Sequence, residues 1–289
     1  MMSVHLKNFI NVTRLNKPIG FLLLFWPCAW GLSLAYYFEK NADTFLYYLF
    51  LFFCGSVLMR SAGCIVNDIV DEKIDREVFR TKNRPIASGS LNKNLAWFYI
   101  LVLCSLAFIV LIQFNLLTIY LGIFSMVFAF SYPFMKRFTY WPQLFLGFTF
   151  NWGIIMAWTA IVNEITYLPI LLYVGAIFWT LGYDTIYGLQ DASDDEVIGV
   201  KSTSIKFKNN LNLFLAGSYI ISSVFLLFVI INLEINYFTI FFLLFMCSLF
   251  YQIKICDPKN PTACLKAFKL NNLSGMFIFL TIYLTALIN

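Results

Sequence analysis

The chain has 289 residues, of which 61% are hydrophobic and 12% are charged, and its formal net charge is +5. A soluble domain carries about 25% charged residues, so a sequence this apolar cannot cover a soluble surface with polar groups. The composition excludes an ordinary soluble domain, and the modest positive charge lacks the clustered basic face of a nucleic-acid-binding protein.

Nine apolar segments follow one another along the chain, each close to the ~20 residues that cross a hydrocarbon core. They predict an all-α integral membrane bundle of nine transmembrane helices. The division between the third and fourth segments, around residues 113–115, depends partly on the charge pattern. Residues 1–18 are polar and the next apolar run lacks a small-residue cleavage site, so we expect no cleavable signal peptide. The predicted spans are 19–38, 45–66, 95–113, 116–134, 142–162, 167–189, 211–232, 236–254 and 271–288.

Basic residues gather at the N-terminus and in every second loop, whereas the intervening loops hold only Lys40. Because cytoplasmic loops carry an excess of Lys and Arg, this pattern predicts the orientation. We expect the N-terminus and both long charged loops to be cytoplasmic and the C-terminus to be outside. The expected location is the plasma membrane, which in bacteria is the inner membrane.

The number and spacing of the cysteines and histidines argue against a site built on these residues. The seven cysteines form no CxxC pair, and His5 is the single histidine. A zinc site needs such ligands at close spacing, and a catalytic triad needs a histidine beside the nucleophile. Most of the cysteines lie in apolar runs, where they act as small hydrophobic residues, so we expect neither zinc nor disulfides.

Ten of the fifteen acidic residues lie in two segments. The first reads NDIVDEKIDREVFRTKNRP (67–85) and the second DTIYGLQDASDDEVIGVKST (184–203). Each begins at the cytoplasmic end of an apolar span, places acids at helical spacing and then becomes basic. The similarity of the two segments predicts one domain, 1–289, with two pseudo-equivalent halves of about 1–140 and 141–289.

The first acidic segment places Asn67, Asp71 and Asp75 at positions i, i+4 and i+8, with Asp68 beside them. Residues at this spacing share one face if the span continues as a helix. A solvated loop of mixed charge is the plainer interpretation of any such run. Here the helical spacing, and the position directly after a span, favour a binding site.

The second acidic segment repeats the arrangement, with Asp184, Asp191 and Asp195 at i, i+7 and i+11. Tyr187 shares this face and Asp194 lies next to it. Two carboxylate faces at one membrane edge form a strong site for a hard cation, and Mg²⁺ commonly bridges a few carboxylates to substrate phosphates. The two segments together predict a magnesium site.

Arg60 lies inside the second span, seven residues before Asn67 and eleven before Asp71, on the same helix face. A charged residue inside a span is costly unless it is paired or faces a cavity, so it indicates function. The alternative is that the side chain extends to the cytoplasmic surface, about 10 Å away.

Eight further basic residues flank the acidic segments or the neighbouring spans. Each alone is a typical anchor on the cytoplasmic side, but together they surround the carboxylates. Cationic side chains and Mg²⁺ are what a departing diphosphate requires, so we expect three or four of the eight to be ligands. They are Arg14, Lys17, Arg80, Lys82, Arg84, Lys136, Arg137 and Lys201.

Five segments resemble the UbiA family of membrane prenyltransferases. They are RLNKPIGFLLLFWPCAWGL (14–32), MRSAGCIVNDIVDEKID (59–75), RTKNRPIASG (80–89), SYPFMKRFTYWPQLFLG (131–147) and GYDTIYGLQDASDDEVIGVKST (182–203). The NDxxDxxxD pattern marks the superfamily as a whole. The last segment resembles the branch that acts on 4-hydroxybenzoate.

This resemblance implies nine spans around a lipid-open central cavity. It also implies transfer of a polyprenyl group from polyprenyl diphosphate to the ring carbon ortho to the hydroxyl of 4-hydroxybenzoate, with release of diphosphate, in ubiquinone biosynthesis. The implied partners are these two substrates and membrane lipid, without nucleic acid, and the implied cofactor is Mg²⁺. Arg60 and Arg137 are the candidates to hold the acceptor carboxylate.

The implied site has three groups of residues. The catalytic residues are Asp71, Asp75, Asp191 and Asp195, and with Asn67 they are also the metal ligands. The substrate-binding residues are Arg14, Lys17, Arg60, Asn67, Asp68, Arg80, Lys82, Arg84, Lys136, Arg137, Tyr183, Asp184, Tyr187 and Lys201.

Two alternatives stay open. Another branch of the same family would use a naphthoate, homogentisate or haem acceptor, and the GVKST-bearing string (199–203) argues against it. A magnesium or proton-coupled transporter would also hold charges inside the membrane, but near the midplane rather than at one edge.

Overall fold

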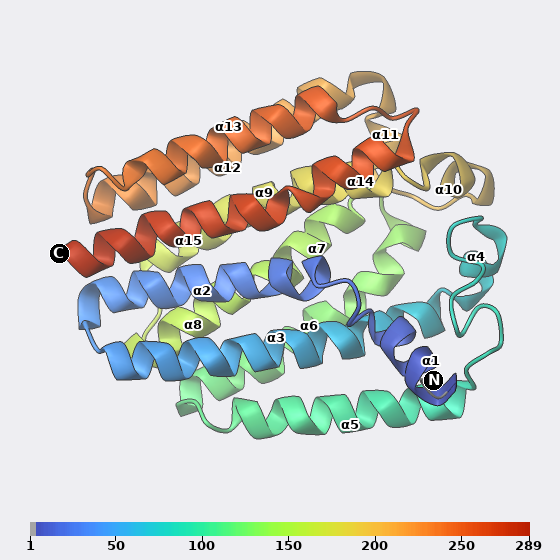
Figure 1. Cartoon of the computed structure of the whole chain (residues 1–289), viewed down its shortest axis with the longest axis horizontal. Helices are drawn as coiled ribbons and strands as arrows, with labels where there is room; N and C mark the ends of the chain where they lie inside the picture. Colours follow the sequence, from blue (N-terminus) through green and yellow to red (C-terminus); the bar gives the residue numbers. More distant parts are fainter. Residues whose placement is uncertain (1–3) are drawn as a thin grey trace.

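The computed structural model describes residues 4–289, and within that range every regular element is helical. The elements follow one another with short connections, apart from the longer segments that carry the acidic motifs (Figure 1). In chain order they are α1 (Val4–Thr13), α2 (Ile19–Glu39), α3 (Ala42–Val70), α4 (Glu72–Glu77), α5 (Lys93–Leu111), α6 (Leu116–Phe138), α7 (Pro142–Asn151), α8 (Gly153–Val162), α9 (Tyr167–Gly188), α10 (Ala192–Ile198), α11 (Thr203–Lys206), the 3₁₀ turn η1 (Lys208–Asn210), α12 (Leu211–Leu233), α13 (Thr239–Ile255), α14 (Pro261–Lys269) and α15 (Asn271–Ile288).

The nine predicted spans correspond to helical segments of the structure. Within residues 4–289, eight segments are long and apolar enough to cross a membrane, and the shorter α13, with 17 residues, matches the predicted span 236–254. The spans lie side by side, and the N- and C-terminal ends lie at opposite ends of the bundle, as an odd number of crossings requires (Figure 1). The chain is therefore an integral all-helical membrane protein.

The fifth span differs from the continuous helix that the sequence predicts. It consists of α7 and α8, which meet at Trp152. A Cβ atom on Gly153 would come within 2.3 Å of the Cys28 sulfur, so the absence of a side chain there lets α8 pass close to α2. The last span is likewise preceded by a separate amphipathic helix, α14, that the sequence did not predict.

The third and fourth spans are separate helices, as predicted. Asn115 is the N-cap residue of α6, and its side-chain carbonyl accepts a hydrogen bond from the Thr118 N–H at 2.9 Å. Its amide donates to the Thr159 carbonyl of α8 at 2.6 Å. One side chain therefore caps a helix and ties the turn between two spans to a third.

The largest core lies among α2, α9, α12, α13 and α15, around Trp30 and Trp179. The two indole rings lie 5.0 Å apart, and each is buried with its N–H bonded. Trp30 donates to the Gly275 carbonyl and Trp179 to the Asn271 side chain, both at 2.8 Å. A second cluster joins α1, α3 and α5 around Ile65. These packed groups hold the helices that surround the site.

Candidate functional site

Both acidic motifs have the same local geometry. α3 ends at Val70, and Asp71 then precedes the short helix α4; α9 ends at Gly188, and Asp191 precedes the short helix α10. Asp71 (φ −94°, ψ 5°) and Asp191 (φ −117°, ψ 2°) have nearly the same backbone conformation, in a sparsely populated region where many active-site residues lie. Both helices end here, so neither span continues through its acidic motif as a single helix.

The helical spacing of the acids survives these breaks. The N–H of Asp75 donates to the Asp71 carbonyl at 2.8 Å, and the N–H of Asp195 donates to the Asp191 carbonyl at 2.8 Å. The Asp71 N–H itself bonds to the Asn67 carbonyl at 2.9 Å. Because each bond joins residues four apart, the carboxylates of each motif stay on one side, as the sequence predicts.

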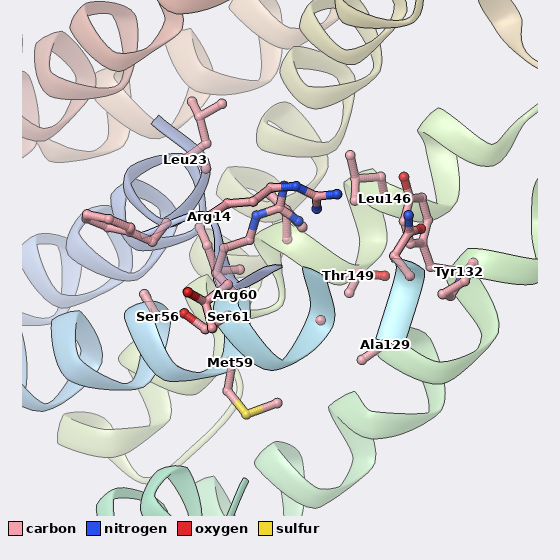
Figure 2. Close-up of a pocket in the computed structure, with 18 of the residues that line it drawn as sticks. Arg14, Leu23, Ser56, Met59, Arg60, Ser61, Ala129, Tyr132, Leu146 and Thr149 are labelled. Atoms are coloured by element: carbon pink, nitrogen blue, oxygen red, sulfur yellow. The ribbon is translucent and has the colours of Figure 1, made fainter. Parts of the chain in front are cut away.

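A cavity of about 1660 Å³ connects the two motifs. Such a volume exceeds the ~300–1,000 Å³ that holds a drug-sized ligand. Figure 2 shows Arg14 and Arg60 pointing into it, toward the wall that carries Tyr132, Leu146 and Thr149. Fifteen of the residues predicted from the sequence line this cavity. They are Arg14, Lys17, Arg60, Asn67, Asp71, Asp75, Arg80, Arg84, Lys136, Tyr183, Asp184, Tyr187, Asp191, Asp195 and Lys201.

Three predicted residues do not line the cavity. Lys82 is exposed and its ammonium group lies 4.6 Å from the centre of the Phe79 ring. Arg137 is exposed and donates to the Val70 carbonyl at 2.8 Å, so it caps the end of α3. Asp68 is buried behind the cavity wall. Direct substrate contact by these three has no support in the geometry.

Asp68 instead holds two arginines that do line the cavity. Its Oδ1 accepts hydrogen bonds from Arg14 at 2.5 Å and from Arg84 at 3.2 Å. Arg84 also donates to Asp75 at 2.8 Å. Asp68, which the sequence predicts to bind substrate, thus ties the segment before α2 to the loop after α4.

Asp71 and Asp191 also pair with cations of the chain. Lys136 of α6 donates to Asp71 Oδ2, and Arg80 makes a two-pronged contact with Asp191, with Nε to Oδ1 at 2.7 Å. Arg80 also donates to the Tyr187 hydroxyl at 3.3 Å. Since Arg80 follows the first motif and Asp191 belongs to the second, this contact brings the two motifs together.

Burial shapes the charge of the carboxyl groups that lie beyond the ends of the spans. Burial raises the pKa of Asp71 above its ordinary value, although Lys136 acts in the opposite direction. Burial also raises the pKa of Asp75, against the effect of Arg84. Burial and the neighbouring Asp191 raise the pKa of Asp195 to about 6. Burial thus disfavours the charged form of these carboxyl groups, and positive charge beside them favours it.

The donor set fits a hard divalent cation. The motifs offer carboxylate and amide oxygens, the ligands that Mg²⁺ prefers. Asp71 Oδ1 is buried and has no hydrogen-bond partner, which is costly for a carboxylate unless a ligand completes it. Within residues 4–289, no three acidic, cysteine or histidine side chains gather closely enough to form a finished metal site. Lys136 and Arg80 instead occupy carboxylate oxygens of the two motifs.

Arg60 lies deeper in the cavity than the motif aspartates. Its guanidinium lies 5.2 Å from the centre of the Phe150 ring, and it forms no ion pair with any described residue. A Cβ atom on Gly20 would come within 2.9 Å of its Nε, so the missing side chain at Gly20 makes room for Arg60. The cationic guanidinium of Arg60 thus lies beside the aromatic ring of Phe150.

Several residues of the site were not predicted from the sequence. Phe268 of α14 packs its ring 4.6 Å from that of Tyr187, and both line the cavity. Gln143 is buried and accepts a hydrogen bond from the Thr203 N–H at 3.0 Å, which fixes the segment after α10. Tyr132 lies one turn before Lys136 on α6, and this spacing is the one signal that could have identified it.

Comparisons with known proteins agree with this geometry. Residues 24–280 match the UbiA prenyltransferase family. The chain is similar to the 4-hydroxybenzoate octaprenyltransferase of Vibrio atlanticus, with 38% identity over 99% of each chain.

Two solved structures share the fold. The apo structure of a UbiA homolog from Aeropyrum pernix is 19% identical, with a TM-score of 0.76 over 91% of this chain and 97% of that chain. A UbiA homolog from Archaeoglobus fulgidus bound to GPP and Mg²⁺ is 15% identical, with a TM-score of 0.70 over 95% and 99%. By sequence and by fold, the chain belongs to the UbiA prenyltransferase family.

Proposed function

We propose that this protein transfers a polyprenyl group from polyprenyl diphosphate to the ring carbon ortho to the hydroxyl of 4-hydroxybenzoate. Diphosphate is released, and the product enters ubiquinone biosynthesis. The name of the Vibrio relative supports this acceptor, since the similarity extends over both chains from end to end. One observation carries the proposal: a single cavity holds the charged motifs at one end and apolar walls over the rest.

The proposed metal ligands are Asn67, Asp71, Asp75, Asp191 and Asp195. Bound Mg²⁺ would neutralise charge on the departing diphosphate. The homolog bound to GPP and Mg²⁺ supports this choice of ion, and the buried Oδ1 of Asp71 supports it from this chain's own geometry. Lys136 and Arg80 would exchange their aspartate partners for phosphate oxygens, because both already lie at the cavity surface.

The aromatic residues between the motifs suit the electron-poor fragment that forms as the allylic C–O bond loosens. Tyr187 and Phe268 pack against each other at the cavity wall, and Tyr132 also lines the cavity. Aromatic faces attract positive charge, and the apolar wall excludes water that would otherwise capture the fragment. The ring carbon of the acceptor then attacks it, and an aspartate of the site accepts the proton lost from the phenol or the ring.

Arg60 is the proposed partner of the acceptor carboxylate. Within residues 4–289 its guanidinium forms no ion pair, and it lies against an aromatic ring, beside which a benzoate ring would fit. A planar fork of N–H donors matches a carboxylate. The sequence offered Arg137 as the other candidate, but Arg137 points away from the cavity toward the Val70 carbonyl. The geometry therefore favours Arg60.

We also propose an orientation of the protein in the membrane and a division of the chain into two similar halves. We infer that the membrane edge with both acidic motifs faces the cytoplasm, because the basic loops lie there. The repeated break at Asp71 and Asp191 supports two pseudo-equivalent halves, of about 1–140 and 141–289.

Turnover tests the proposed function directly. Purified protein in lipid vesicles, given Mg²⁺, a prenyl diphosphate and 4-hydroxybenzoate, should form prenylated hydroxybenzoate and diphosphate in equal amounts. Excess EDTA should abolish the reaction. Activity only with a naphthoate, homogentisate or haem acceptor would contradict the acceptor, and full activity in EDTA would contradict the metal.

A further inference from the structure

Two glycines in the middle of α3 have no packing reason to be glycine. Cβ atoms built on Gly55 and Gly63 meet no atom within 4 Å, whereas one on Gly153 would clash. Neither glycine has the positive φ that favours this residue. Glycine weakens a helix interior relative to alanine, but at these two positions it leaves space open beside the helix. Both residues line the central cavity.

One face of α3 borders the cavity along most of its length. With a rise of 1.5 Å per residue, Gly63 lies about 12 Å and Gly55 about 24 Å from Asp71 along the helix axis. The wall therefore extends from Asp71 back to Leu51, over most of the length of α3. The cavity-lining residues of this face recur every three or four positions and include Phe52, Ser56, Arg60, Gly63, Asn67 and Asp71.

The far end of the cavity is apolar and partly closed by aromatic rings. Phe52 of α3 and Phe114, which lies between α5 and α6, pack with ring centres 4.8 Å apart. Leu111, Gly122 and Met156 line the same region. A hydrocarbon chain gains free energy in such surroundings, whereas a charged group does not.

We propose that the prenyl chain runs along this face of α3, first over Gly63 and then over Gly55, and ends against Phe52 and Phe114. This inference rests on the proposed prenyl transfer. Gly63 keeps the path open near the reacting end, and Gly55 keeps the far part open. Gly55 therefore determines how long a chain the cavity accepts, and a side chain there should discriminate against long chains only.

Chain-length preference of Gly55→Leu tests this assignment. Turnover is measured with 4-hydroxybenzoate and either geranyl diphosphate, a short chain, or octaprenyl diphosphate, a long one. The Gly55→Leu variant should keep geranyl transfer and lose about tenfold or more in octaprenyl transfer, since pocket shape discriminates by this amount. Gly63→Leu should lose both activities.

Gly217→Leu is the matched control. Gly217 also lies inside a helix, α12, and its Cβ would meet no atom within 4 Å, but it does not line the cavity. This variant should keep the wild-type ratio of the two activities. Gly55→Ala should shift the ratio in the same direction as Gly55→Leu by a smaller amount, and it decides the question if the leucine variant does not fold.

An unchanged ratio in folded Gly55→Leu would overturn the assignment, because the chain would then leave the cavity for the lipid before it reaches Gly55. Equal loss of both activities in the folded variant would overturn it too. Failure of the proposed function is separate and visible in the wild type, which would then form no product with either diphosphate.

Discussion

Four of the motif aspartates form ion pairs with positive charges of the chain itself. Asp71 pairs with Lys136 and Asp191 with Arg80, while Asp68 holds Arg14 and Arg84. Removal of one partner of a buried pair leaves an uncompensated charge, so these residues affect more than one neighbour. Their individual roles are best separated by substitutions that preserve shape.

Asp71→Asn and Asp191→Asn should each lower turnover by about 100-fold, the usual effect of losing one electrostatic contact to a developing charge. The amide keeps the shape but loses the negative charge that binds the metal. The measurement is kcat in vesicles, with thermal unfolding to show that each variant is folded. Asp43→Asn serves as the control, because Asp43 is exposed in the first turn of α3. Equal losses in all three variants would indicate general instability.

Arg60→Lys keeps the charge but loses the planar fork that suits a carboxylate. The KM for 4-hydroxybenzoate should rise about tenfold or more, while the KM for the prenyl diphosphate stays within about twofold. Arg60→Ala should show the same pattern more strongly. A rise confined to the KM of the diphosphate would place Arg60 with the leaving group, and no change in either constant would remove it from the site.

The helix ends position these residues, and they are where sequence and structure differ most. Hydropathy predicted each span to within a few residues, because a bilayer dictates helix length. It did not predict the break at Trp152 or the helix α14. These features depend on tertiary contacts, namely the approach of Gly153 to Cys28 and the packing of Phe268 on Tyr187.

Asn115→Ala should destabilise the protein by about 1–2 kcal/mol, the typical effect of removing a helix N-cap. The substitution also removes the hydrogen bond to α8. Thermal unfolding of the protein in detergent measures the change. The control is Asn94→Ala, at an exposed position in the first turn of α5, which should lower the transition temperature much less.

The orientation of the loops is testable with single cysteines. Lys82→Cys, in a background without the exposed Cys247, should be labelled by a membrane-impermeant thiol reagent only after the membrane is opened. Lys82 is exposed and lies outside the cavity, so the change should leave the site intact. Tyr237→Cys, between α12 and α13, should be labelled in intact cells. The reverse pattern would refute the predicted orientation.

The whole molecule places two sequence-distant motifs at one end of the bundle (Figure 1), and one cavity connects them. Fifteen of the residues predicted from the sequence line this cavity, and carboxylates and cations inside a membrane protein are rarely without function. Lys82 and Arg137 also satisfy the charge pattern, but neither lines the cavity. Only side-chain direction separates a cation at the cavity surface from one that caps α3 or lies over Phe79.

The ion pairs that Lys136 and Arg80 form with the motif aspartates have a thermodynamic consequence. A divalent cation alone would have to displace Lys136 and Arg80 from their aspartates and leave both without partners. Diphosphate alone would attract the same cations and leave the aspartates uncompensated. When both ligands arrive, every charge finds a new partner, so each should strengthen the binding of the other, by the same factor in both directions. Calorimetric titration of Mg²⁺ with and without diphosphate measures this cooperativity, and equal affinities in the two titrations would show that the ion pairs do not need to exchange.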